Sequence, residues 1–105
     1  MKIKKHVLYL GLNDKDTKQQ EISTIDAYKI VTRATLAAGY EGATITEATG
    51  IYTHAAGEVV IEKSLEIGLL FADDSRTDAL IKELKVLFNQ ESIALQKMTI
   101  ESALV

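Results

Sequence analysis

Apolar and polar residues alternate with a period of two over four stretches of the chain, residues 4–12, 43–52, 59–72 and 92–101. This period predicts β-strands, because successive side chains of a strand point to opposite faces of a sheet. In the first stretch both sides are largely apolar, which favours a central position in the sheet. Between the second and third stretches, Ala55-Ala56-Gly57 predicts a hairpin turn.

Two further stretches carry apolar residues at helical spacing. Ser23 or Thr24 can cap the first helix, which Gly39 ends. Asp73 and the two residues after it can cap the second helix, which runs to about Asn89. The residues expected to face the core are Ile25, Tyr28, Val31, Thr32, Thr35 and Leu36 in the first helix, and Ala79, Leu80, Leu84, Leu87 and Phe88 in the second.

The order strand–helix–strand, strand–helix–strand over residues 1–105 predicts a single α+β domain, the ferredoxin-like plait (βαββαβ). In that fold a four-stranded antiparallel sheet carries both helices on one face. The opposite face, called the open face below, is solvated, binds a ligand or is covered by another subunit. The polar run 13–21 predicts an exposed, mobile loop between the first strand and the first helix.

The open face carries an unusual mixture of side chains. Antiparallel pairing around Ala56 predicts three cross-strand pairs on it, Glu62–Gly50, Ser64–Ala48 and Glu66–Thr46. The same alternation adds Val7, Tyr9, Val60 and Leu70. Two carboxylates and a tyrosine among small and aliphatic residues are typical of a shallow pocket or an oligomer interface. Solvated or paired surface carboxylates are the commoner alternative.

The predicted hairpin extends beyond the helices. Glu47 and Lys63 fall on its helix side as diagonal neighbours that can form an ion pair, which an apolar core would not allow. The apolar residues near its tip then need a second subunit to cover them. These residues are Ile51, Tyr52, Val59 and Ile61. We expect a homo-oligomer, either a dimer or a trimer.

Charge and composition argue against two classes of partner, nucleic acids and membranes. The chain has 12 Lys and Arg against 15 Asp and Glu, a net charge of −3, so no nucleic-acid partner is expected. No apolar stretch approaches the ~20 residues of a membrane span. The basic start and short apolar run lead directly into Asn13, with no signal-peptide cleavage site between. We expect no membrane association and a cytoplasmic location.

Motifs for catalysis or cofactor binding are missing from the sequence. His6 and His54 have no metal-ligand spacing, the glycines match no phosphate-binding loop, and the chain has no cysteine. Ser64 and Ser92 have no neighbouring His–acid pair. We therefore expect no cofactor and no metal. The segment from Gln90 to Ser92 is either a helix cap or part of a site.

Four short segments match a recurrent pattern: LYLGLN (8–13), ATITEATGIY (43–52), EKS (62–64) and FNQESI (88–93). Together they resemble an uncharacterised family of small bacterial proteins with Leu-Tyr-Phe-Gly-Leu and Phe-x-Gln-Glu-Ser-Val motifs. The chain departs from that pattern with Leu10 in place of Phe and Tyr52 in place of Trp. The resemblance implies no catalytic role, but it draws attention to Tyr9, Gly50, Glu62, Gln90, Glu91 and Ser92.

The strand order also resembles that of the trimeric PII and CutA proteins and of the dimeric α+β barrels. The leading hypothesis is a homo-oligomeric small-ligand-binding or regulatory module that uses the open face. The alternatives are a cofactor-independent enzyme, with Glu62 or Glu66 as base and Tyr9 orienting the substrate, and a structural protein-interaction module. Whether the protein is an enzyme stays open. The candidate ligand-binding residues are Tyr9, Tyr52, Glu62, Ser64, Glu66 and Gln90.

Overall fold

The computed structural model describes residues 1–53 and 56–105, so the turn residue Ala55 and His54 lie outside the described part. The elements follow the predicted order and confirm the ferredoxin-like plait. They are β1 (Lys2–Gly11), α1 (Thr24–Ala37), β2 (Thr44–Thr53), β3 (Val59–Leu70), α2 (Asp74–Leu87) and β4 (Ala94–Glu101).

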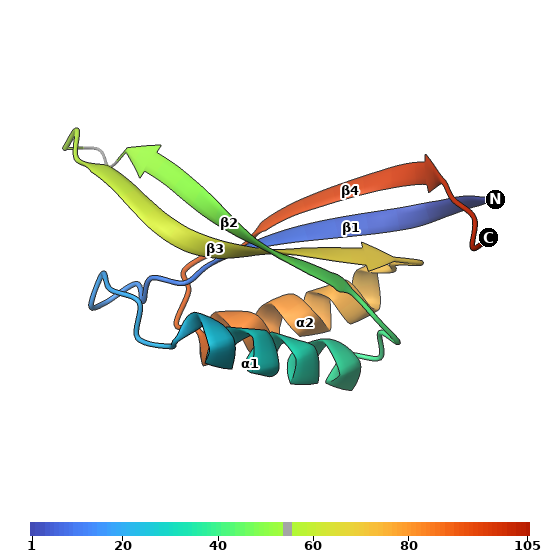
Figure 1. The fold of residues 1–105 in the computed structure, drawn as a ribbon, viewed down its shortest axis with the longest axis horizontal. Coiled ribbons are helices and arrows are strands. Elements are labelled where there is room, and N and C mark those ends of the chain that lie inside the picture. Colours follow the sequence, from blue (N-terminus) through green and yellow to red (C-terminus); the bar gives the residue numbers. More distant parts are fainter. Residues whose placement is uncertain (54–55) are drawn as a thin grey trace.

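The four strands form one antiparallel sheet in the order β2-β3-β1-β4. β1 therefore lies inside the sheet between β3 and β4, as its apolar character predicted. Both helices lie on the same side of the sheet, and its other side is uncovered (Figure 1). The predicted hairpin register is also confirmed, because Glu62 pairs with Gly50, Ser64 with Ala48 and Glu66 with Thr46.

The core lies between the sheet and the helices. Its completely buried aliphatic side chains come from β1, β3, α1 and α2, and each contributes about 1.5–3 kcal/mol when it is removed from water. They are Leu8, Leu10, Val31, Leu65, Ile67, Leu69, Leu80 and Leu84.

The buried face of α1 differs from the predicted one. Ala27, Val31 and Ala34 are buried, whereas Ile25 and Leu36 are exposed. At 100° per residue, Ile25 and Leu36 each stand about 200° around the helix from an alanine of the buried stripe. The prediction was right for Val31 and Thr35, which are buried, and the small alanines beside them bring the helix close to its neighbours. Thr32, also predicted to face the core, is exposed.

The second helix needs a smaller correction. Leu80, Leu84 and Phe88 are buried as predicted, but Ala79 and Leu87 are exposed. The buried stripe instead includes a polar group at the N-terminal end of the helix, Thr77.

Thr77 joins α2 to β1 and to the loop after α1 through hydrogen bonds. Its Oγ1 lies 2.7 Å from His6 Nδ1 and 2.6 Å from the hydroxyl of Tyr40, and all three residues are buried. Desolvation by burial lowers the pKa of His6, and nearby Lys97 lowers it further. The cluster satisfies buried polar groups that would otherwise destabilise the fold.

The β2–β3 hairpin projects past the rest of the sheet, as Figure 1 shows. The pairing of β1 with β3 ends at Gly11 and Ser64, and one more backbone hydrogen bond joins the N–H of Leu12 to the carbonyl of Lys63, so β3 residues 59–62 pair only with β2. Ile51 and Ile61 at this end are 70% and 67% exposed. The predicted pair is present, with Lys63 Nζ 3.9 Å from Glu47 Oε1, and at this exposed site it adds little to stability.

Candidate functional site

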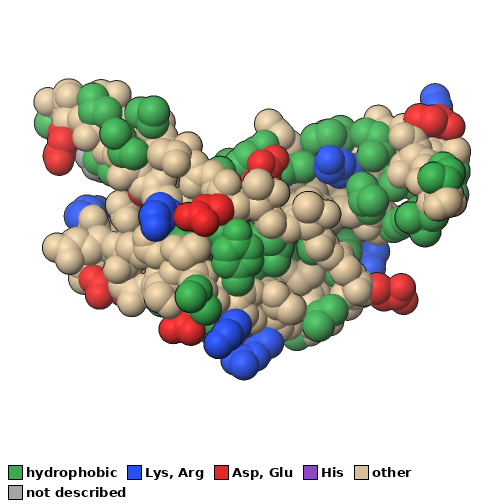
Figure 2. All heavy atoms as spheres, viewed as in Figure 1, with side chains coloured by type: hydrophobic (Ala, Val, Ile, Leu, Met, Phe, Trp, Pro, Cys, Tyr) green, Lys and Arg blue, Asp and Glu red, His purple; other side chains and the backbone are tan. Residues whose placement is uncertain are grey.

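A hollow of about 770 Å³ lies between the projecting hairpin and two loops of the body. Figure 2 shows the hairpin standing away from the rest of the molecule at this end. The lining comes from three separate parts of the chain: the loop after β1, both strands of the hairpin, and the turn before β4. The residues are Asn13, Asp14, Lys15, Lys18, Tyr52, Glu58, Val59, Val60, Ile61, Glu62, Gln90, Glu91 and Ser92.

Glu62 is held in this hollow by the backbone around it. Its Oε2 accepts the N–H of Asn13 at 3.0 Å. A Cβ on Gly11 would stand only 2.6 Å from Glu62 Oε1, so the carboxylate occupies space that any other residue at position 11 would fill. Gly50 on the neighbouring strand also faces Glu62. A Cβ added to Gly50 would lie 3.8 Å from Glu62 Cγ. The missing side chain of Gly11 thus makes room for the half-buried carboxylate, whereas a Cβ on Gly50 would be in ordinary van der Waals contact with the Glu62 side chain.

The loop after β1 forms the opposite wall and is held by polar contacts. The Asp14 carboxylate accepts the N–H groups of Asp16 and Thr17 at 2.8 and 3.0 Å and the side-chain amide of Asn89 at 3.0 Å. These hydrogen bonds stabilise the charged form and lower the pKa of Asp14. The sequence showed no apolar periodicity that could hold this loop, and hydrogen bonds do so instead.

Gln90 belongs to the same wall. Its Nε2 donates to the carbonyl of Asn13 at 2.6 Å and to that of Phe88 at 3.2 Å. The first contact fixes the loop after β1, and the second satisfies a carbonyl at the end of α2. The Gln90 side chain therefore caps the C-terminal end of α2 and also lines the hollow.

The hollow is lined by four carboxylate residues and two lysines. The ammonium of Lys18 donates to the carbonyl of Lys15 at 2.5 Å. Among the described residues, no ion pair includes Glu62. The lining consequently carries an excess of negative charge around a fixed carboxylate.

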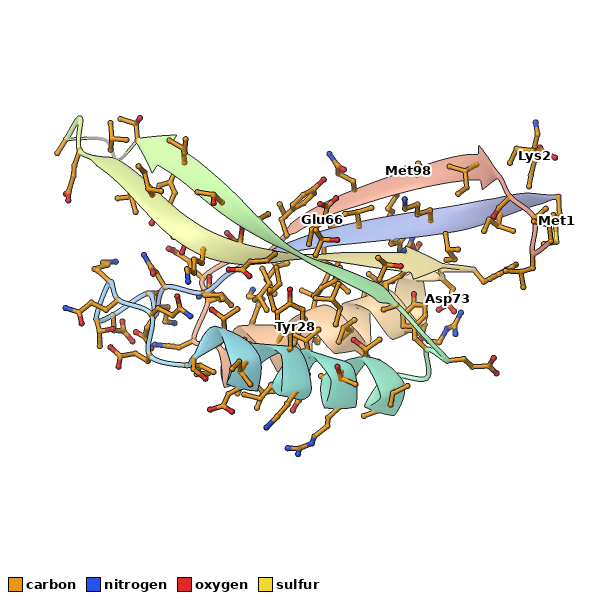
Figure 3. The ribbon with its side chains drawn as sticks, viewed as in Figure 1. Met1, Lys2, Tyr28, Glu66, Asp73 and Met98 are labelled. Carbon is orange, nitrogen blue, oxygen red and sulfur yellow. The ribbon has the colours of Figure 1, made fainter. Side chains whose placement is uncertain are left out.

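Tyr9 and Glu66 form a second group on the open face. The hydroxyl of Tyr9 lies 3.4 Å from Glu66 Oε1 and 3.1 Å from Gln96 Oε1. Burial and the neighbouring Glu66 charge raise the pKa of Tyr9. Figure 3 labels Glu66 near the middle of the sheet, on its uncovered side. Four residues along β3 separate it from Glu62, which is about 13 Å at the rise of a strand.

The candidate residues thus fall into two groups. Tyr52, Glu62 and Gln90 line the hollow, and Tyr9 and Glu66 pair in the middle of the sheet. Ser64 is buried, with its Oγ 3.9 Å from the position of a Cβ on Gly50. Five lining residues were not predicted as site residues, and the four in the loop show only as a polar run directly after a strand. The five are Asn13, Asp14, Lys15, Lys18 and Glu58.

Among residues 1–53 and 56–105, no three His, Asp or Glu side chains are grouped so that they could hold a metal ion. In the same described part, no helix has the length and hydropathy to span a membrane.

Fold and hollow together define a small α+β plait with a ligand-sized site between its hairpin and its loops. The chain belongs to the family DUF3574, described as a protein of unknown function, whose model matches residues 5–103. This confirms membership of an uncharacterised family. No curated protein matches the chain.

Solved structures share the fold. A phage SAM lyase in complex with S-methyl-5'-thioadenosine is 24% identical, with a TM-score of 0.72 over 90% of this chain and 79% of that one. The periplasmic divalent cation tolerance protein CutA from Archaeoglobus fulgidus is 12% identical, with a TM-score of 0.63 over 95% and 87% of the two chains. GlnK of B. subtilis, solved with ATP, is 10% identical, with a TM-score of 0.55 over 90% and 83%. The expected likeness to PII and CutA proteins is therefore present at the level of the fold.

Proposed function

We propose that this protein is a homo-oligomeric module that binds a small organic ligand in the hollow beneath the hairpin. The observation that carries the proposal is the hollow itself, whose volume of about 770 Å³ is that of a typical ligand site. It combines a fixed carboxylate, Glu62, with the apolar side chains of Val59, Val60 and Ile61. A small-molecule site uses placed polar groups for orientation and apolar surface for burial, and this lining supplies both.

Self-association is supported by the projecting hairpin. Its tip exposes Ile51 and Ile61, and the inner edge of residues 59–62 is left without a neighbouring strand. Exposed apolar side chains beside a free strand edge are typical of a surface that pairs with another chain. A second copy of this chain covers the hairpin in the proposed assembly and closes the hollow from outside.

Ligand binding is tested by calorimetry with S-methyl-5'-thioadenosine, the ligand in the phage SAM lyase structure. Val60→Trp fills the hollow and is expected to weaken binding at least about tenfold, because the ligand loses its space. Val86→Trp, on an exposed position of α2 outside the hollow, is the matched control and should bind as the wild type does. No binding by the wild-type protein, or equal binding by both variants, contradicts the proposal.

Assembly is tested by light scattering behind size exclusion at two concentrations. The wild-type protein should run as a dimer or trimer, and Ile61→Lys should shift it to the monomer by placing a charge in the apolar contact. Val86→Lys makes the same change on an equally exposed valine of α2 and should leave the mass unchanged. A wild-type monomer at micromolar concentration contradicts the assembly.

A second candidate is a cofactor-independent lyase that acts on a sulfonium nucleoside. It is favoured by the 24% identity to the phage SAM lyase together with the carboxylate placed in the hollow. Glu62 is the acid–base group of this candidate, since the pair Tyr9–Glu66 lies about 13 Å further along the sheet. Release of S-methyl-5'-thioadenosine from S-adenosylmethionine, followed by chromatography, tests it. Turnover that Glu62→Gln abolishes supports the lyase, and a rate equal to that without protein contradicts it.

A further inference from the structure

We propose that the hollow selects an organic cation of nucleoside size, a sulfonium or ammonium compound, whose positive charge pairs with the Glu62 carboxylate. The inference rests on the proposed function, because it names the class of ligand that the same site binds.

The first argument is that the Glu62 carboxylate has acceptor capacity left for a ligand. An ionised carboxylate offers two oxygens and about four lone-pair positions. One of these takes the N–H of Asn13 at Oε2. Among the described residues no hydrogen bond reaches Oε1 and no lysine or arginine forms an ion pair with this side chain. A half-buried carboxylate without a cation gains most from a ligand that supplies one.

The second argument is the charge of the surrounding wall. Asp14, Glu58 and Glu91 add three carboxylates to the lining, against Lys15 and Lys18. Lys18 already donates its ammonium to a backbone carbonyl. An anionic ligand would meet this excess of negative charge, whereas a cation is attracted by all four acidic residues.

The third argument is that the same hollow offers apolar surface beside the carboxylate. Val60 stands next to Glu62 on the hairpin's open face, with Tyr52 opposite it on β2. A compact hydrated ion would leave this surface in water, while a cation that carries an aromatic or aliphatic group covers it. The lining thus favours an organic cation over an inorganic one.

The position of the charge depends on Gly11. A methyl group there would stand 2.6 Å from Oε1 and 2.9 Å from Cδ of Glu62, closer than non-bonded atoms allow, so the carboxylate would have to move. Gly11 is therefore a positioning residue for the carboxylate. Gly42 is a matched control, because a Cβ added there meets nothing within 4 Å.

The experiment compares S-adenosylmethionine with S-adenosylhomocysteine by calorimetry on the full chain. The two differ by one methyl group and by the sulfonium charge. The wild-type protein should bind the sulfonium at least about tenfold more tightly, since a charge-assisted contact is lost in the thioether. Glu62→Gln should reduce that ratio to about one while it keeps the affinity for the thioether. Gly11→Ala should lower the ratio as well, and Gly42→Ala should leave it unchanged.

Three outcomes separate this inference from the proposed function. Equal binding of the two nucleosides by the wild-type protein overturns the inference and leaves the ligand site in place. A preference for the sulfonium that Glu62→Gln does not reduce also overturns it, because the charge is then recognised elsewhere. If neither these nucleosides nor neutral S-methyl-5'-thioadenosine binds, both the inference and the proposed function fail. Far-ultraviolet circular dichroism of each variant confirms that the fold is kept.

Discussion

The side chain of His6 in β1 is buried, with Nδ1 against the hydroxyl of Thr77 and Nε2 3.9 Å from Asp74 Oδ1. Burial lowers its pKa below the ordinary value of 6.5, and the charge of Asp74 offsets only part of this. In the sequence, His6 stands out only as one of two histidines without metal-ligand spacing. The cluster could not be predicted, because His6 and Thr77 are 71 residues apart in the sequence and Tyr40 and Thr77 are 37 apart.

The lowered pKa of His6 predicts a loss of stability in mild acid. Below pH 6.5 the unfolded chain binds a proton that folded His6 resists, so the contribution is present above that pH and declines as the pH falls. The free energy of unfolding in urea, measured from pH 8 to pH 5, should therefore decrease toward pH 5. His6→Gln should flatten this dependence.

The pKa values of Asp14, Asp73 and Asp74 are lowered from 3.8, so their contributions are lost only at more acidic pH. A slope between pH 5 and pH 7 that His6→Gln leaves unchanged would contradict the assignment to His6.

At the scale of elements, the strands followed their sequence pattern more closely than the helices did. The period of two predicted the register of β3 correctly. A shift by one residue would move its apolar side chains to the polar face of the sheet. In α1 the predicted stripe combined Val31 and Thr35, which are buried, with Ile25 and Leu36, which are exposed. Packing of the helix against the rest of the core buries Ala27 and Ala34 beside Val31 instead.

This choice of helix face can be measured. Val31→Ala should lower the free energy of unfolding by about 2 kcal/mol, because it removes buried methyl groups and leaves a cavity. Leu36→Ala removes more atoms from an exposed position and should change the free energy by less than about 0.5 kcal/mol. Urea unfolding of the two variants gives the comparison. The reverse order of effects would mean that Leu36, and not Val31, faces the core.

The wall of the hollow depends on the turn after α2. Asn89 adopts a left-handed backbone with φ of 48°, which asparagine tolerates better than most residues, and its amide binds the carboxylates of Asp14 and Asp16. Asn89→Ala should therefore free the loop after β1. Amide hydrogen exchange of Asp16 and Thr17 is expected to accelerate, while that of the β1 core residue Leu8 stays slow. Unchanged exchange at Thr17 would show that the loop is held without Asn89.

At the scale of the whole molecule, the hairpin and the body are the two parts that enclose the hollow. If the protein assembles through the hairpin, its thermal midpoint should rise with protein concentration, because association stabilises the folded state by mass action. Scanning calorimetry at protein concentrations a hundredfold apart measures the shift. Ile61→Lys should remove it, and a midpoint that is independent of concentration in the wild-type protein would contradict assembly.

The sequence by itself determined the order of the elements and the register of the hairpin. Both features follow from the local periodicity of each segment and from the turn residues between them, which can be recognised without any long-range contact. Only the tertiary structure decided that the loop after β1, the hairpin and the segment 90–92 enclose one hollow. The contacts that join them, such as Asn89 to Asp14 across 75 residues, are single polar hydrogen bonds, and such bonds leave no periodic pattern in the sequence.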